Sequence, residues 1–181
     1  MSLKNYNYDI STLKLKQAKL AELSKEKTGL TDLPVDDLVM WLLAEAGEAL
    51  NEAKFFKYCR KIEVNRDKLL EELTDCLFMF LEISLIEDFT NTDYANSNKV
   101  DNLNMIDTEI NIAEAFSYLM SDISLAYRKY QIGYTNDFKR KLYDAMCTYV
   151  SILYYYKFTN EELHTVYNKK YEVNVGRLMS L

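Results

Sequence analysis

The sequence predicts an all-α fold, a helical bundle of about six helices. Its 181 residues include only four Gly and one Pro, too few for the many tight turns that a sheet of short strands requires. Leu, Lys, Glu and Ala, which favour helices, are abundant instead. The hydrophobic fraction of 49% is enough for a sizeable core, so we expect a single domain over residues 1–181.

Apolar spacing and the residues that begin or end helices place the first three elements. The first helix is expected over about residues 9–27 and ends near Gly29, because glycine commonly terminates helices. The chain is redirected at Pro34, and the second helix follows over about 35–59. The third helix begins after Asn65 as its N-cap and ends at about residue 87.

The second half of the chain contains one long polar loop and three further helices. The loop covers residues 88–102, and the next two helices are expected over about 107–131 and about 136–157. The last helix begins at Thr159, because Thr159 and Glu162 have the spacing of a capping box. We find no internal repeat and expect no strand.

Charge and residue types exclude several classes of protein. The net charge of −6 argues against a nucleic-acid-binding protein, which needs a basic face. The three cysteines are far apart and His164 is the only histidine, so we expect no zinc site. No apolar stretch of about 18 residues and no signal peptide occur, so we expect a cytoplasmic protein with reduced thiols and no membrane segment.

Two pairs of carboxylates interrupt the most apolar part of the chain. They form a Glu-x-x-Glu and a Glu-x-x-Asp motif and comprise Glu45, Glu48, Glu72 and Asp75. Residues three apart share one helix face, and the second pair lies at the edge of an apolar stripe. A single such pair is more often part of a solvated helix face. Four acids that face one another across two helices, however, require a cation, because no Lys or Arg follows Asp75 by three or four residues.

The chemistry of these side chains indicates which cation they would bind. Oxygen ligands without His or Cys favour a hard ion, and Mg²⁺ keeps coordination positions open for water and for substrate phosphates. Two Mg²⁺ ions about 3.5–4 Å apart can hold a triphosphate and stabilise a departing pyrophosphate, while a neighbouring Glu accepts a proton from water. The motif therefore predicts Mg²⁺-dependent phosphate chemistry, although the same spacing also arises by chance in Glu-rich helices.

The two acid motifs resemble the signature of the all-α nucleoside triphosphate pyrophosphatases, the MazG-like superfamily. Within that superfamily the chain is most similar to the dimeric dUTPases. Their further motifs are a Gln in the first helix, a Phe-Lys-x-Trp-like segment, and Lys-x-x-x-Asn-x-x-Arg near the C-terminus. The matching residues here are Gln17, Phe56-Lys57-Tyr58, Lys170, Asn174 and Arg177. The chain departs from the family pattern at Cys59, where we expect Trp, and at Phe78, where His is common.

The resemblance implies a homodimeric enzyme that hydrolyses dUTP to dUMP and pyrophosphate with Mg²⁺ held by the four acids. It implies that water attacks the β-phosphorus, so that dUDP is also a substrate. Gln17 would bind the uracil, and Phe56 and Lys57 would also contact the substrate. A glutamine hydrogen-bonded to backbone in the core is the alternative role for Gln17.

The last motif places Lys170, Asn174 and Arg177 on one face of the final helix. The resemblance implies that this face binds phosphate and sugar oxygens, for which Lys and Arg are suited. The alternative is a solvated basic face.

Two other functions remain open at this stage. A related pyrophosphatase would act on dCTP or on a broad range of nucleoside triphosphates. A helical binding module without catalytic activity would use the acids to hold a structural cation or a basic partner.

Overall fold

The computed structural model describes residues 8–30, 33–57, 63–87, 89 and 111–181. Within these ranges the chain forms six helices and no strand, which confirms the predicted all-α fold. The helices are α1 (Ser11–Thr28), α2 (Val35–Ala53), α3 (Arg66–Ile86), α5 (Ile112–Gln131), α6 (Thr135–Tyr155) and α7 (Asn160–Met179). None of the helices in the described ranges is long and apolar enough to cross a membrane.

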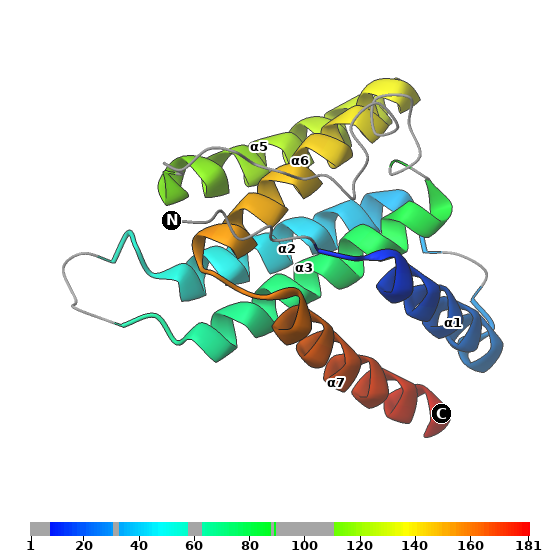
Figure 1. The fold of residues 1–181 in the computed structure, drawn as a ribbon. Helices are drawn as coiled ribbons and strands as arrows, with labels where there is room; N and C mark the ends of the chain where they lie inside the picture. Colours follow the sequence, from blue (N-terminus) through cyan, green and yellow to red (C-terminus); the bar gives the residue numbers. More distant parts are fainter. Residues whose placement is uncertain (1–7, 31–32, 58–62, 88, 90–110) are drawn as a thin grey trace.

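The helices are arranged in layers around α3 (Figure 1). The pair α5 and α6 covers one side of α2 and α3, and α1 and α7 lie on the opposite side. Helix α3 contacts α1, α2, α6 and α7, so it lies at the centre of the bundle. This arrangement places the faces of α2 and α3 that carry the acid motifs next to α7.

The predicted apolar stripes of α2 and α3 form the core between these layers. All eight of their members are fully buried. They are Leu42, Ala46, Ala49 and Ala53 on α2, and Leu69, Leu73, Cys76 and Phe80 on α3. Small alanines on α2 allow the two helices to approach closely, because they occupy little space between the backbones. The acids adjoining these stripes therefore lie at the edge of a tightly packed interface.

Several predicted helix ends are confirmed by the local hydrogen bonds. The side chain of Asn65 accepts from the backbone N–H of Lys68, which caps α3. Helix α1 ends at Gly29, whose φ of 71° glycine adopts without steric strain. The capping box of Thr159 and Glu162 is complete at the start of α7.

The second helix is shorter than predicted. It ends at Ala53 rather than near residue 59, because Lys54 adopts a left-handed conformation with φ of 56°. The backbone N–H of Lys57 then bonds to the carbonyl of Lys54 at 2.9 Å and forms a turn. Residues 58–62 and the predicted loop at 88–102, apart from Phe89, lie outside the described residues.

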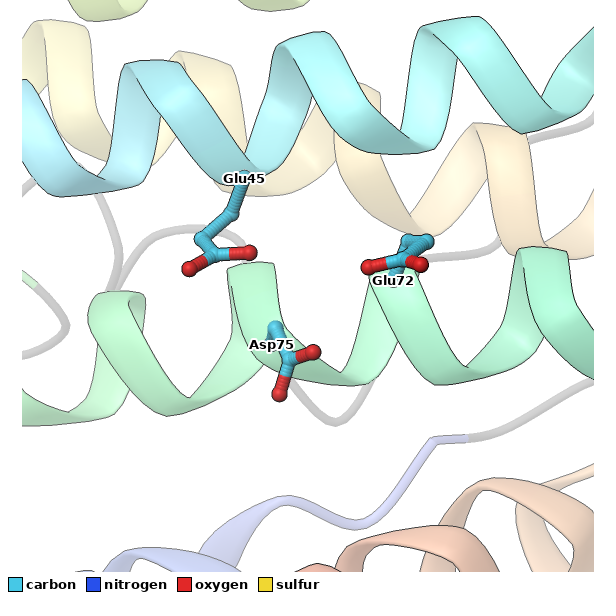
Figure 2. A group of neighbouring side chains, drawn as sticks. All are labelled: Glu45, Glu72 and Asp75. Atoms are coloured by element: carbon cyan, nitrogen blue, oxygen red, sulfur yellow. The ribbon is translucent and has the colours of Figure 1, made fainter.

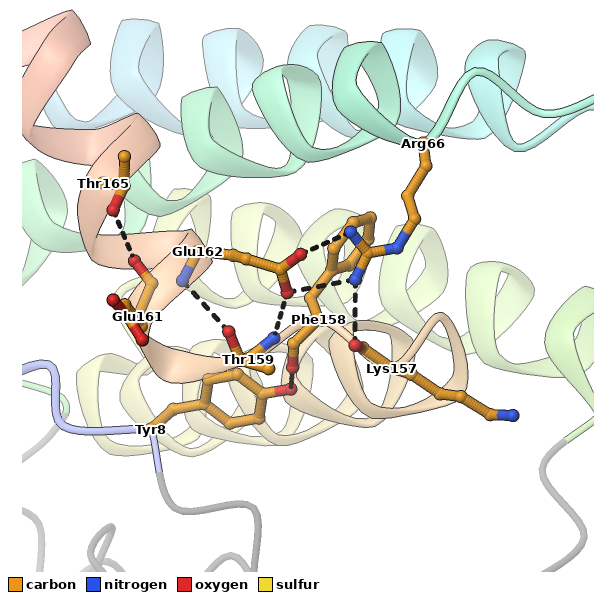
Figure 3. A network of polar contacts seen from close by, with 8 residues as sticks. All are labelled: Tyr8, Arg66, Lys157, Phe158, Thr159, Glu161, Glu162 and Thr165. Carbon is orange, nitrogen blue, oxygen red and sulfur yellow. Dashed lines mark hydrogen bonds and ion pairs between the residues drawn. The ribbon is translucent and has the colours of Figure 1, made fainter.

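The start of α7 is fixed to the start of α3 by a polar cluster (Figure 3). The guanidinium of Arg66 donates to both carboxylate oxygens of Glu162, at 2.5 and 3.0 Å, and to the carbonyl of Lys157 at 2.9 Å. It also lies 4.4 Å from the centre of the Phe158 ring, within the range of a cation–π contact. Tyr8 donates to the carbonyl of Phe158 at 2.5 Å. These contacts determine where α7 crosses α3 and hence which residues of α7 reach the acids.

Candidate active site

Three of the four predicted acids converge between α2 and α3 (Figure 2). Glu45 extends from α2, and Glu72 and Asp75 extend from α3. One carboxylate oxygen of each residue lies within 4.8 Å of those of the other two. All three side chains are partly buried. The i, i+3 spacing on α3 and the contact between the two helices together produce this group.

Burial and mutual repulsion raise the pKa values of these three carboxyl groups. Burial is the largest cause in each case. A hydrogen bond from Trp41 Nε1 to Glu45, at 2.6 Å, partly offsets the rise in the pKa of Glu45. Negative charge on Asp75 and Glu48 raises the pKa of Glu72 further. The protein thus holds negative charge where a cation would lower the electrostatic energy.

Glu48, the fourth predicted acid, lies beside this group instead of within it. Its side chain is exposed and lines a smaller cavity of about 400 Å³, together with Glu72 and Lys68. Its charge still raises the pKa values of the other three acids. Its role as a metal ligand stays a prediction.

The converging acids fit a magnesium ion. Their donor atoms are all carboxylate oxygens, the type that Mg²⁺ prefers, and softer His or Cys ligands do not join them among the described residues. Glu45, Glu72 and Asp75 would hold the ion. The cavities on either side, one lined by Glu48 and Glu72 and the other by Glu45 and Asp75, leave room for water and for a phosphate group.

Asp75 has a protein counterion that local sequence spacing did not reveal. Lys170 of α7 donates a hydrogen bond from Nζ to Oδ2 of Asp75. This contact lowers the pKa of Asp75, but burial has the larger effect, so that pKa stays above its ordinary value. The basic face of α7 therefore reaches the acid group directly.

A larger cavity, about 690 Å³ in volume, connects Gln17 and the basic face of α7 with Glu45 and Asp75. This volume lies in the range that small-molecule sites usually occupy. Residues of α1, α2, α3 and α7 form its wall. The predicted site residues in that wall are Gln17, Glu45, Asp75, Lys170, Asn174 and Arg177. Apolar side chains, including Leu20, Leu38, Phe78 and Met79, form much of the remainder.

Gln17 lies in the wall of this cavity with both parts of its amide engaged by side chains. Its Nε2 donates to Oε2 of Glu82 at 2.6 Å, and its Oε1 accepts from the Tyr167 hydroxyl at 2.7 Å. Both of these bonds run to side chains, whereas the alternative role was a core glutamine bonded to backbone. Phe78, which replaces the common family His, stacks on Tyr167 with ring centres 4.2 Å apart.

Neither Glu82 nor Tyr167 was among the residues predicted from the sequence to form the site. Helical spacing in the sequence could have indicated both of them. Glu82 follows Asp75 by two helical turns on α3, and Tyr167 precedes Lys170 by one turn on α7, so each shares a face with a predicted site residue.

The segment after α2 lies outside the larger cavity. Phe56 is 47% exposed, and Lys57 Nζ donates to Oδ1 of Asn51 at 2.6 Å. Asn51 lines the smaller cavity next to Glu48, so Lys57 is close to that cavity. Tyr58 and Cys59, which belong to the same predicted segment, lie outside the described residues.

Comparison with known proteins gives one match. A family model described as dUTPase matches residues 9–180. No curated protein and no solved structure matches the chain. The matched range covers all six helices and contains both acid motifs. The chain therefore belongs to this all-α dUTPase family, in agreement with its resemblance to the MazG-like pyrophosphatases.

Proposed function

We propose that this protein hydrolyses dUTP to dUMP and pyrophosphate in a Mg²⁺-dependent reaction within the larger cavity. One observation supports the proposal most strongly. A single cavity contains a buried amide at Gln17, carboxylates at Glu45 and Asp75, and the basic residues Lys170 and Arg177. A deoxynucleoside triphosphate needs these three kinds of contact: one for the base, one for a cation and one for phosphate.

The carboxylates would hold the ion next to the phosphates. Bound Mg²⁺ supplies Lewis acidity to the triphosphate and stabilises the negative charge on the departing group. Glu45, Glu72 and Asp75 provide converging oxygens for it, and we propose Glu48 as the fourth ligand. A carboxylate of this set accepts the proton of the attacking water.

The face of α7 would bind the phosphate and sugar oxygens. Lys170, Asn174 and Arg177 all line the larger cavity, which supports binding over a merely solvated face. The Nζ of Lys170 contacts Asp75. It therefore lies beside the position that a phosphate bound next to the metal would occupy. Lys and Arg both donate charge-assisted hydrogen bonds to phosphate oxygens.

We further propose that water attacks the β-phosphorus, so that dUMP is the leaving group. The new P–O bond then belongs to pyrophosphate, and the α-phosphate keeps its own oxygens. In H₂¹⁸O, the label would enter pyrophosphate and not dUMP. The same attack on dUDP would release dUMP and orthophosphate, so dUDP should also be hydrolysed.

Proposals for the oligomeric state and the number of domains follow from the same family resemblance. We propose one domain and a homodimer, as the similarity to dimeric dUTPases implies. Sedimentation equilibrium of the purified chain measures the assembly, and a monomer at micromolar concentration would contradict the dimer.

A substrate panel tests the proposed activity against its alternatives. The purified protein is incubated with dUTP, dUDP, dCTP, dTTP and dATP, each with Mg²⁺ and with EDTA, and the monophosphate released is measured. We expect turnover of dUTP and dUDP in Mg²⁺ only. Comparable turnover of dCTP would favour a related pyrophosphatase, and binding of Mg²⁺ without any turnover would favour a helical binding module.

A further inference from the structure

The environment of Gln17 fixes which way its amide faces. The residue is only 4% exposed, and its two hydrogen bonds are directional. The Glu82 carboxylate can only accept, so the N–H₂ side of the amide must face it. The carbonyl side must then face the hydroxyl of Tyr167.

Tyr167 is well suited to hold the carbonyl side. It is fully buried, and burial raises the pKa of its hydroxyl far above the ordinary value, so the hydroxyl keeps its proton. That oxygen lies 2.7 Å from Oε1 of Gln17 and 3.3 Å from the carbonyl of Leu13. A phenol has one proton to donate, and the shorter contact is the one to Gln17. Stacking on Phe78, at an interplanar angle of 6°, fixes the ring itself.

Turning the Gln17 amide by 180° would break the hydrogen bond to Glu82 and would make the Tyr167 hydroxyl accept instead of donate, leaving only the longer contact to the Leu13 carbonyl for its proton. It would also place the amide carbonyl against the carboxylate of Glu82, where two acceptors would face each other at 2.6 Å. Buried polar atoms without partners are strongly unfavourable. The amide therefore cannot turn freely to suit a different ligand.

The fixed amide has one N–H and one carbonyl lone pair that these two bonds do not use. Uracil presents a carbonyl oxygen beside N3–H, an acceptor next to a donor, which complements such a pair. Cytosine has a lone pair at N3 instead of a proton. Against the fixed carbonyl of Gln17, the N3 of cytosine would meet a second acceptor, and only a turned amide could accommodate it.

We propose that Glu82 and Tyr167 are positioning residues that lock the Gln17 amide in the orientation selective for uracil over cytosine. This inference rests on the proposed function, in which Gln17 binds the base. Glu82 lines the larger cavity and Tyr167 does not, and both act through the Gln17 amide, to which each is hydrogen-bonded. An amide that is free to rotate would bind uracil and cytosine almost equally well. An amide held in one orientation accepts from N3–H of uracil and is repelled by the N3 lone pair of cytosine.

Two substitutions release the lock while preserving side-chain shape. Glu82→Gln replaces the carboxylate by an amide that can donate or accept, so either orientation of Gln17 finds a partner. Tyr167→Phe removes the hydroxyl and keeps the ring that stacks on Phe78. The measurement is the ratio of kcat/KM for dUTP to kcat/KM for dCTP, with both nucleotides competing in one reaction. We expect each variant to lower this ratio at least about tenfold, the scale set by leaving a buried polar group mismatched.

Matched controls make the same atomic changes at exposed positions. Glu22→Gln on α1 and Tyr155→Phe on α6 lie outside the wall of the larger cavity, and both should keep the wild-type ratio. A second control combines Glu82→Gln with Gln17→Ala. Because Glu82 acts through Gln17, the double variant should have the same ratio as Gln17→Ala alone.

The outcomes separate this inference from the function on which it rests. If wild type prefers dUTP strongly and both folded variants keep that preference, the lock is wrong and the proposed function stands. If wild type uses dCTP as readily as dUTP, the proposed function itself is wrong. Should Tyr167→Phe fail to fold in a thermal unfolding assay, Glu82→Gln decides alone, because Glu82 is only partly buried.

Discussion

Lys170 and Asp75 form an ion pair that joins α7 to the acid group on α3. Both side chains are partly buried, with 26% and 31% of their surfaces exposed, so water screens the pair only in part. Asp75 therefore contacts a residue proposed to bind phosphate while being itself proposed to bind metal. A cation at the acid group must share Asp75 with Lys170, and this competition leads to the first prediction.

Lys170→Met should destabilise the protein more without metal than with it. Removing the ammonium leaves Asp75 without this counterion, at a cost of about 1–2 kcal/mol. For a chain of this size that cost lowers Tm by about 2–8 °C. Saturating Mg²⁺ should reduce the difference, because the ion restores positive charge at Asp75. Thermal unfolding in EDTA and in Mg²⁺ measures the effect, with Lys19→Met on the exposed part of α1 as the control. An equal loss in both conditions would contradict the competition.

Glu72→Gln should stabilise the metal-free protein and inactivate the enzyme. Burial and the charges of Asp75 and Glu48 raise the pKa of Glu72, so its ionised form is unfavourable in the folded chain. We expect a higher Tm in EDTA at pH 7 and a kcat for dUTP lower by at least about a hundredfold.

Asp75→Asn provides the matched comparison. It should inactivate the enzyme to a similar degree without the same stabilisation, because it leaves Lys170 without its partner. Equal stabilisation by both variants would show that the ion pair contributes nothing to the fold.

Glu162→Gln should weaken the protein at neutral pH and change its response to acid. Hydrogen bonds from Arg66 lower the pKa of Glu162 to about 2, against an ordinary value of 4.5. Between these values the folded chain binds fewer protons than the unfolded chain. The stabilisation is therefore complete above about pH 4.5 and is lost as the pH falls towards about 2.

Both partners of this pair are more than a third exposed, so solvent screening limits the ion-pair contribution. Because glutamine can still accept from the backbone N–H of Thr159, the capping box remains, and we expect a reduction of about 0.5–1 kcal/mol in the free energy of unfolding at pH 7. Urea unfolding between pH 3 and pH 7 measures it. The variant should show a flatter dependence on pH than wild type, and identical dependences would count against the role of Arg66.

Arg177→Ala should weaken binding of the triphosphate. Arg177 lines the larger cavity and is otherwise exposed, so its loss should cost a charge-assisted hydrogen bond, about 1.5–3 kcal/mol, and leave the fold intact. This corresponds to a fall in kcat/KM for dUTP of about 10- to 150-fold. Arg140→Ala, on the exposed surface of α6, is the control and should keep wild-type kinetics. Full activity of Arg177→Ala would indicate that this end of α7 is solvated surface.

The parts of the fold that depend on neighbouring residues were predictable. Gly29 ends α1, Asn65 caps α3, and Thr159 with Glu162 begins α7, because each acts within one helical turn. The end of α2 was not predictable in this way. Lys54 adopts a left-handed conformation that lysine seldom takes, and its contact with the buried carboxylate of Glu52 is part of the folded environment that accommodates it.

The same distinction applies to the site. Spacing within helices predicted four acids, of which Glu45, Glu72 and Asp75 converge and Glu48 does not. The resemblance predicted roles for Gln17 and the basic face of α7. The partners of these residues come from distant segments. Lys170 reaches Asp75 across 95 positions of the sequence, and Gln17 is held by residues 65 and 150 positions away. Periodicity along one helix cannot reveal such pairs, because they depend on how α1, α3 and α7 pack together.

The most direct test of the central claim is the release of dUMP and pyrophosphate from dUTP by wild type, Glu72→Gln and Glu161→Gln, each in Mg²⁺ and in EDTA. Glu161 is an exposed acid at the start of α7, so its variant controls for the loss of one negative charge. We predict equal amounts of dUMP and pyrophosphate from wild type and Glu161→Gln in Mg²⁺ only, with Glu72→Gln at least about a hundredfold slower. Turnover that persists in EDTA, or that is unchanged in Glu72→Gln, would contradict a metal-dependent reaction at these carboxylates.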